Sequence, residues 1–230
     1  RLVIVYSNGN IDLLSEKLDI TNISDYYDKS LTYDKTINNV FTNGNLTYLA
    51  TGFGIVVVNV SNATIADTYA LQEKVKDLCI NNGIIYVATN KEIIKGDMRK
   101  NLADPNEWDK LASDGFDWLF WMDEGLVGAK KYNISTIAVD GTMKKQAGPY
   151  MDNCVMQNGM LFACGGNDTY CYHTSSDCGY IAKHLNTVAA DTKDGSFWIH
   201  DDDGSLANMT LAADRTFTIN KTGIKADGPD

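Results

Sequence analysis

The fold of this chain is decided by a phrase that recurs along it: a polar turn with glycine, followed by an apolar strand. One copy reads NGIIYVATNKEIIKGD (residues 82–97) and another reads NGNLTYLATGFGIVVVNV (residues 43–60). The glycine can adopt the positive φ that a tight hairpin requires. The residues that follow are mostly β-branched or aromatic, which is typical of strands. Similar phrases follow the glycines at 125, 159 and 195.

These turn glycines, at positions 44, 83, 125, 159 and 195, are separated by 39, 42, 34 and 36 residues. That period matches propeller blades, whereas helical repeats of similar length would need apolar residues at 3.6-residue spacing. The sequence therefore predicts an all-β fold, a β-propeller of four-stranded antiparallel blades, with about five to six blades present and the ring incomplete. We expect one propeller domain over residues 1–230, with approximate units 1–44, 45–83, 84–125, 126–159, 160–195 and 196–230.

One unit shows the expected order of strands. Residues 75–80 are predicted to form the innermost strand, 84–89 the second and 92–95 the third. The polar segment 97–115 that follows contains Pro105 and is predicted to be a loop between outer strands, with a helical turn around residues 106–111.

The first residues also contain a hairpin signal, Asn8-Gly9, but it follows one apolar strand and precedes another. It aligns with residues 51–54, a turn between second and third strands. We therefore expect the chain to start at a second strand, as a fragment of a longer protein with exposed blade edges.

Composition limits the classes of partner. The formal net charge is -10 and no run of Lys and Arg offsets it, which argues against nucleic acid or an anionic lipid surface as the main partner. Apolar stretches such as residues 55–58 are far too short to cross a membrane as a helix.

No catalytic, cofactor-binding or metal-binding motif is present. The three histidines share no common motif, and neither a nucleophile elbow nor a phosphate-binding glycine loop occurs. The acidic stretch HDDDGS (residues 200–205) fits a hairpin apex better than a calcium loop, because adjacent aspartates in a strand point to alternate sides. We expect a protein that is not an enzyme and binds no cofactor or metal.

Three of the five cysteines, Cys164, Cys171 and Cys178, are spaced by seven residues. A disulfide joining Cys171 to either of the other two would suit an oxidising compartment. Buried thiols are the equal alternative, and a metal site would need four donors in a compact geometry.

The aromatic stretch FDWLFWM (residues 116–122) is predicted mainly to pack between blades. Strand alternation would bury Phe116, Trp118 and Phe120 together and leave Trp121 on the other face. The alternative is an exposed platform for sugars or for side chains of a partner, and Trp118 and Trp121 are the candidate residues for that surface.

The stretches YSNGNIDL (residues 6–13), ITNI (20–23), KTINNV (35–40) and YLATGFGIVVVN (48–59) resemble the N-terminal β-propeller of the PorZ family. The tail IKADGP (residues 224–229) resembles the lead-in to a following blade. Members of this family are envelope proteins of Bacteroidetes, related to the periplasmic propellers of hybrid two-component regulators.

The resemblance implies a secreted protein of the periplasm or the outer-membrane cell surface, with no catalytic residues in this propeller. PorZ proteins work in type IX secretion beside the PorU sortase, where cargo is attached to anionic lipopolysaccharide. The expected function is thus a protein-interaction scaffold, with a PorU-like sortase, lipopolysaccharide or another glycan, and the remainder of its own chain as partners. The alternative function is a ligand-sensing propeller that binds glycans, like those of hybrid two-component regulators.

Overall fold

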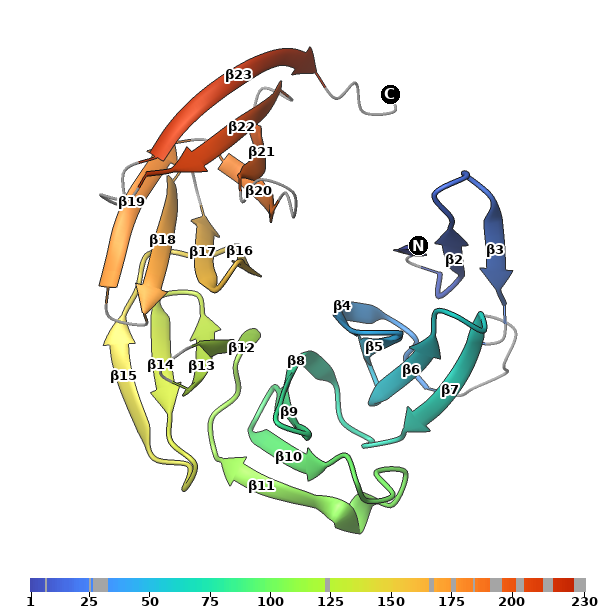
Figure 1. Ribbon diagram of the computed structural model, residues 1–230. Helices are drawn as coiled ribbons and strands as arrows, with labels where there is room; N and C mark the ends of the chain where they lie inside the picture. Colours follow the sequence, from blue (N-terminus) through green and yellow to red (C-terminus); the bar gives the residue numbers. More distant parts are fainter. Residues whose placement is uncertain are drawn as a thin grey trace. The chain divides into compact units, whose positions relative to one another are not determined.

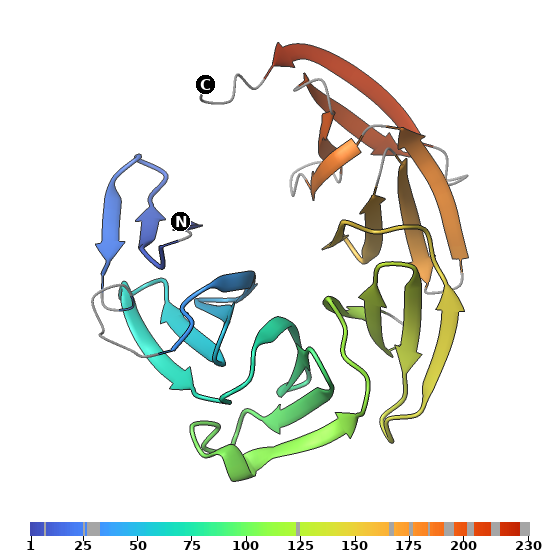
Figure 2. The ribbon, with the colours of Figure 1, turned by 180° about the vertical axis from the view of Figure 1, so that it is seen from behind.

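The computed structural model of this chain consists of six antiparallel sheets, each built from consecutive strands. Figures 1 and 2 show each sheet from opposite sides as a simple meander. This is the arrangement of propeller blades, and the first blade has three strands where the others have four. The all-β propeller prediction is confirmed. The structure describes residues 1–230 except 7, 25, 27–32, 123–124, 166–167, 175–176, 184, 191–195, 202–204, 213–216 and 226–230, and the side chains at 177–183, 185–190, 200, 201, 211 and 225 are likewise not described.

The chain divides into two compact units, and the first comprises Arg1–Trp121 with Val139–Thr142. It contains three of the sheets and a short 3-10 helix, η1. The first sheet has strands β1 (Leu2–Val5), β2 (Ile11–Leu14) and β3 (Ile20–Ile23). The second has β4 (Ile37–Asn43), β5 (Leu46–Thr51), β6 (Ile55–Asn59) and β7 (Thr64–Tyr69). The third has β8 (Val75–Asn81), β9 (Ile84–Thr89), β10 (Ile93–Asp97) and β11 (Trp108–Ala112), with η1 (Pro105–Glu107) before β11.

The second unit comprises Met122–Ala138 and Met143–Asp230. The fourth sheet has β12 (Trp118–Met122), of which Trp118–Trp121 belong to the first unit, followed by β13 (Gly125–Lys130), β14 (Asn133–Ile137) and β15 (Met143–Ala147). The next has β16 (Asn153–Gln157), β17 (Met160–Gly165), β18 (Asp168–Thr174) and β19 (Asp177–Lys183). The last has β20 (Leu185–Ala190), β21 (Phe197–Asp201), β22 (Ser205–Leu211) and β23 (Phe217–Lys225).

The turn between first and second strands has the predicted chemistry. Asn81 pairs with Ile84, so that Asn82 and Gly83 alone form the turn, with φ of 49° and 76°. The Asn158–Gly159 turn has nearly the same values, 48° and 74°. A two-residue hairpin with positive φ at both positions favours Asn-Gly, and this is why the repeat can be found from its turns.

The apolar strands are buried between neighbouring sheets. In β6 the four residues Ile55–Val58 are at most 2% exposed. Ile55 and Val57 pack in one core with residues of β8 and β9, whereas Val56 and Val58 pack in another with residues of β2. Successive side chains of a strand point to opposite faces, and a strand that is apolar throughout is therefore buried on both sides.

Two boundaries differ from the predictions. The helical turn predicted at residues 106–111 of the polar segment is η1, at Pro105–Glu107. Residues 108–111 belong to β11, because they pair with β10. The predicted units end at the glycine turns and thus cut each blade after its inner strand, whereas the sheets begin with that strand. The single domain over residues 1–230 stays a prediction. None of the helices in the described part of the chain is long and apolar enough to cross a membrane.

Candidate interaction site

The connection between β10 and β11, residues 98–107, is longer than the corresponding connections of neighbouring blades. Val60–Ala63 joins β6 to β7, and Ser15–Asp19 joins β2 to β3. We call residues 98–107 the insertion. Its sequence is mostly polar, yet its first residue is held, since the Met98 N–H donates to the Gly83 carbonyl at 2.9 Å.

The inner side of the insertion is anchored in the core by Leu102. This side chain is 3% exposed and packs with buried residues of β5, β8 and β9. The indole of Trp108 donates to the Leu102 carbonyl at 3.0 Å, and its ring lies 5.9 Å from that of Tyr69. Gly96 makes room for the anchor, because a Cβ there would lie 2.7 Å from a Leu102 methyl group. The insertion is therefore part of the blade and not a loose loop.

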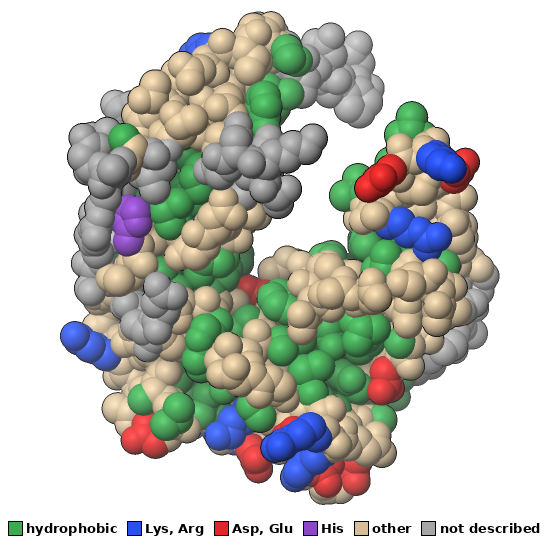
Figure 3. Space-filling view, in the orientation of Figure 1, with side chains coloured by type: hydrophobic (Ala, Val, Ile, Leu, Met, Phe, Trp, Pro, Cys, Tyr) green, Lys and Arg blue, Asp and Glu red, His purple; other side chains and the backbone are tan. Residues whose placement is uncertain are grey.

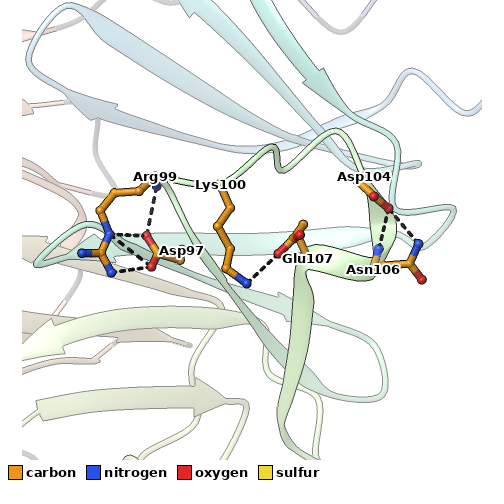
Figure 4. A network of polar contacts seen from close by, with 6 residues as sticks. All are labelled: Asp97, Arg99, Lys100, Asp104, Asn106 and Glu107. Carbon is orange, nitrogen blue, oxygen red and sulfur yellow. Dashed lines mark hydrogen bonds and ion pairs between the residues drawn. The ribbon is translucent and has the colours of Figure 1, made fainter.

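The outer side of the insertion is a set of charged pairs (Figure 4). Arg99 donates to both carboxylate oxygens of Asp97, the shortest contact being 2.6 Å, and Lys100 contacts Glu107 at 2.6 Å. Asp104 accepts from the Asn106 N–H at 2.9 Å and thereby caps η1. The hydrogen bonds from Arg99 hold the pKa of the Asp97 carboxyl below its ordinary value.

These pairs are exposed, and Arg99 is 86% exposed. Such exposed pairs contribute little to the free energy of unfolding, because water screens them. What they supply is a fixed arrangement of alternating charges on a rigid support, which is suited to recognising a protein surface. Figure 3 shows acidic and basic side chains gathered along the lower edge of the view, where Figure 1 places β11 and the connection from β10.

The two tryptophans predicted as a surface do not come together. Trp118 and Trp121 are both half-buried, and because they are three residues apart in β12 they point to opposite faces. The Trp121 ring lies 5.4 Å from that of Tyr86 in β9. Phe116 and Phe120 are buried as predicted, but Trp118 is not buried with them. A partner surface at Trp118 and Trp121 stays a prediction.

A buried carboxylate that the sequence analysis missed lies on the inner strand β8. Asp77 is 3% exposed and accepts from the Asn39 side chain of β4 and from the Leu119 N–H of β12, each at 2.7 Å. Its own strand supplies a third donor, the Leu78 N–H at 2.7 Å. Burial raises the pKa of Asp77 to about 7, against the opposing effect of these hydrogen bonds. One side chain thus joins three inner strands, which is a structural role.

Lys76, the residue before Asp77, and Asn38 make further polar contacts between the inner strands of neighbouring blades. Lys76 forms an ion pair with Asp117 before β12, and Asn38 donates to the Val75 carbonyl at 2.7 Å. Asn38 and Lys76 both stand at a register shift of their inner strand, where a β-bulge turns the side chain out of the regular alternation. The signal in the sequence was a pair of adjacent polar residues near the start of each inner strand, Asn38-Asn39 in β4 and Lys76-Asp77 in β8.

The structure supports the buried-thiol alternative for Cys164 and leaves the disulfide to Cys178 untested. Cys164 is a buried free thiol, and its neighbours across the sheet are Asn153 and Thr169 and not Cys171. The Cys171 thiol is buried and donates to the sulfur of Met160 at 3.8 Å. Cys178 pairs with Tyr172 through the backbone, but its side chain lies outside the described part of the structure. A bridge to Cys178 stays a prediction.

In the part of the chain that the structure describes, no three His, Cys, Asp or Glu side chains are close enough to hold a metal ion. The acidic stretch at 200–205 lies largely outside that part, since residues 202–204 and the side chains of His200 and Asp201 are not described.

Comparison with known proteins supports the resemblance seen in the sequence. Residues 1–109 match the family model of the N-terminal β-propeller domain of PorZ, of the type IX secretion system. The structure is similar to that of PorZ of Porphyromonas gingivalis, an essential bacterial surface component of the type IX secretion system, with a TM-score of 0.83 and 26% sequence identity. The match covers 99% of this chain and 31% of PorZ, so the chain spans about a third of that protein.

More distant structures share the fold alone. The extracellular domains of two hybrid two-component systems from B. thetaiotaomicron have TM-scores of 0.64 and 0.62, at 10% and 13% identity. They are covered to 33% and 35% of their length, and this chain to 98% and 97%. The comparison with curated proteins gives no match. The chain is therefore similar to the N-terminal β-propeller of PorZ, in sequence over its first 109 residues and in structure over 99% of its length.

Proposed function

We propose that this propeller is a non-enzymatic interaction module of a cell-envelope protein, and that the insertion is its contact with a protein partner. The observation that carries the proposal is the two-sided build of residues 98–107. Leu102 fixes the inner side in the core, while Asp97, Arg99, Lys100 and Glu107 hold charges at fixed places outside. A rigid surface loses little conformational entropy on binding.

The similarity to PorZ supports a partner in type IX secretion, and we propose a PorU-like sortase at the cell surface. The remainder of the same polypeptide, and lipopolysaccharide or another glycan, are the further proposed partners. The net charge of -10 argues against nucleic acid.

Reversing the two basic charges, R99E with K100E, is expected to weaken partner binding by about tenfold or more. The reversal turns each ion pair into a like-charge pair but leaves Leu102 and the core in place, so the melting temperature should change little. The measurement is surface plasmon resonance of purified variants against the PorU-like sortase of the same organism.

The matched control is K91E. Lys91 is 74% exposed and pairs with Glu73, but it lies in the turn between β9 and β10, at the opposite end of β10 from the insertion. Sortase binding that is equally weakened by K91E, or unchanged in the double variant, would contradict a contact through the insertion.

Ligand sensing is the second candidate function. It is favoured by the fold shared with the extracellular domains of hybrid two-component systems. A gene in which a transmembrane helix and a kinase domain follow this propeller would decide for sensing and against the scaffold.

A further inference from the structure

Two tyrosines of the second unit form an exposed aromatic pair. Tyr132 is 57% exposed and Tyr150 is 38% exposed, and their ring centroids lie 5.2 Å apart at an angle of 50°. Aromatic rings that serve only the core are buried, as Phe162 and Phe197 are in the same unit at 0% and 1% exposure. The two rings are therefore in contact with each other while both remain exposed to solvent.

The two rings come from separate connections that are bonded to each other. Tyr132 lies in the two-residue turn between β13 and β14, since Lys130 pairs with Asn133. Tyr150 lies between β15 and β16. The Gly148 N–H donates to the Tyr132 carbonyl at 2.7 Å and thus fixes one connection against the other.

The backbone around Tyr150 is fixed on both sides. Gly165 lies so close that a Cβ there would be 2.1 Å from the Tyr150 carbonyl oxygen. The next side chain, Met151, is 1% exposed, and the Asp152 N–H donates to the Cys164 carbonyl at 2.8 Å. The exposed Tyr150 ring is therefore attached to a buried and hydrogen-bonded backbone, so that ligand binding would cost little conformational entropy.

The turn that presents Tyr132 departs from the usual turn chemistry. Its first residue, Lys131, has a φ of 33°, a conformation that favours glycine. The turns at residues 82–83 and 158–159 meet this demand with Asn-Gly. Here a lysine and a tyrosine occupy the turn, so that the exposed Tyr132 stands where these other two-residue turns have glycine.

We propose that Tyr132 and Tyr150 form a saccharide-binding site, in which the apolar face of a pyranose ring stacks on the tyrosines. The Tyr150 hydroxyl is hydrogen-bonded to Asp152, which orients the ring and places a carboxylate acceptor for sugar hydroxyls beside it. Lys131, which is exposed, precedes Tyr132 in the turn and carries an ammonium group that can donate to a sugar.

The chemistry favours a sugar over other ligands. An apolar peptide segment would leave the charges of Lys131 and Asp152 desolvated and unmatched at this small patch. A sugar presents both an apolar ring face and hydroxyl groups that act as donors and acceptors, so it matches rings and charges together. The site lies in the second unit. It rests on the glycan partner named in the proposed function and does not depend on the proposed contact through the insertion.

The test is isothermal titration calorimetry of the whole chain with five probes: maltohexaose, cellohexaose, xylohexaose, mannohexaose and chitohexaose. We expect saturable binding of at least one of them, and a loss of about tenfold or more in affinity for Tyr132→Ala. Tyr150→Phe keeps the ring and removes only the bond to Asp152, so it should weaken binding less than Tyr150→Ala.

The matched control is Tyr6→Ala. Tyr6 is 42% exposed and donates to Asp12 at 2.8 Å, but no aromatic ring lies against it among the described residues. A flat response to all five probes would overturn the proposal, as would equal losses in Tyr132→Ala and Tyr6→Ala. Sortase binding by the same variants separates this result from the scaffold proposal, which predicts no change for Tyr132→Ala.

Discussion

Replacing Asp77 by alanine is expected to lower the free energy of unfolding by about 3 kcal/mol. The change leaves the Asn39 amide and the Leu119 N–H without their acceptor inside the protein. An unsatisfied buried donor costs about 1 to 3 kcal/mol, and relief from burying a carboxylate offsets only part of that. The measurement is urea unfolding followed by tryptophan fluorescence, since Trp108, Trp118 and Trp121 all belong to the same compact unit as Asp77.

The raised pKa of Asp77 also predicts how the free energy of unfolding changes with pH. The pKa of Asp77 is raised to about 7 in the folded chain from an ordinary value of 3.8, so the folded state binds more protons than the unfolded state between these values. Its contribution to stability is therefore present at low pH and is lost as pH rises from about 4 to 7. Asp77→Asn cannot titrate, so this part of the slope should disappear in that variant.

Asp77→Asn also serves as the matched control for Asp77→Ala. The amide keeps one acceptor oxygen for Asn39, but its NH2 group meets the donor of Leu119, so we expect a loss of about 1 to 2 kcal/mol. If the slope between pH 4 and 7 is the same in wild type and Asp77→Asn, then Asp77 titrates normally and the desolvated carboxylate is the wrong description.

Strands and turns could be predicted because their signals are local. The second strand of the third blade was expected at residues 84–89, and β9 occupies Ile84–Thr89. Its boundary depends on the Asn82–Gly83 turn and on alternation, both readable within a few residues. The burial of β6 on two faces likewise follows from its unbroken apolar run.

The sites could not be predicted in the same way, because their residues meet only after blades have stacked. Asp77 and Leu119 are 42 positions apart, and Leu102 reaches a core made by β5, β8 and β9. Tyr132 and Tyr150 approach each other through one hydrogen bond between two connections. Alternation also misjudged Trp118, which is half-buried in β12, because alternation gives the face of a residue and not what packs against that face. The register shifts in the inner strands β4 and β8 were likewise missed, since a strict period of two contains none.

Leu102→Ala is expected to lower the free energy of unfolding by about 3 kcal/mol, although Leu102 lies in a polar connection between outer strands. The side chain is 3% exposed and belongs to the same core cluster as Leu78, Ile85 and Val87, so its removal opens a cavity in that core. The same loss frees the insertion, and we expect faster trypsin cleavage after Arg99 and Lys100 in native buffer.

The control is Arg99→Ala, which removes an 86% exposed partner of Asp97 and should leave the free energy of unfolding nearly unchanged, because water screens the pair. The comparison separates the two sides of the insertion: Leu102 supplies stability, whereas Arg99 supplies only the charged surface. Leu102→Ala that unfolds like the wild type would mean that residues 98–107 are a loose connection. A loose connection would have to be ordered by its partner at a cost in affinity, and the insertion would then no longer be a preformed contact.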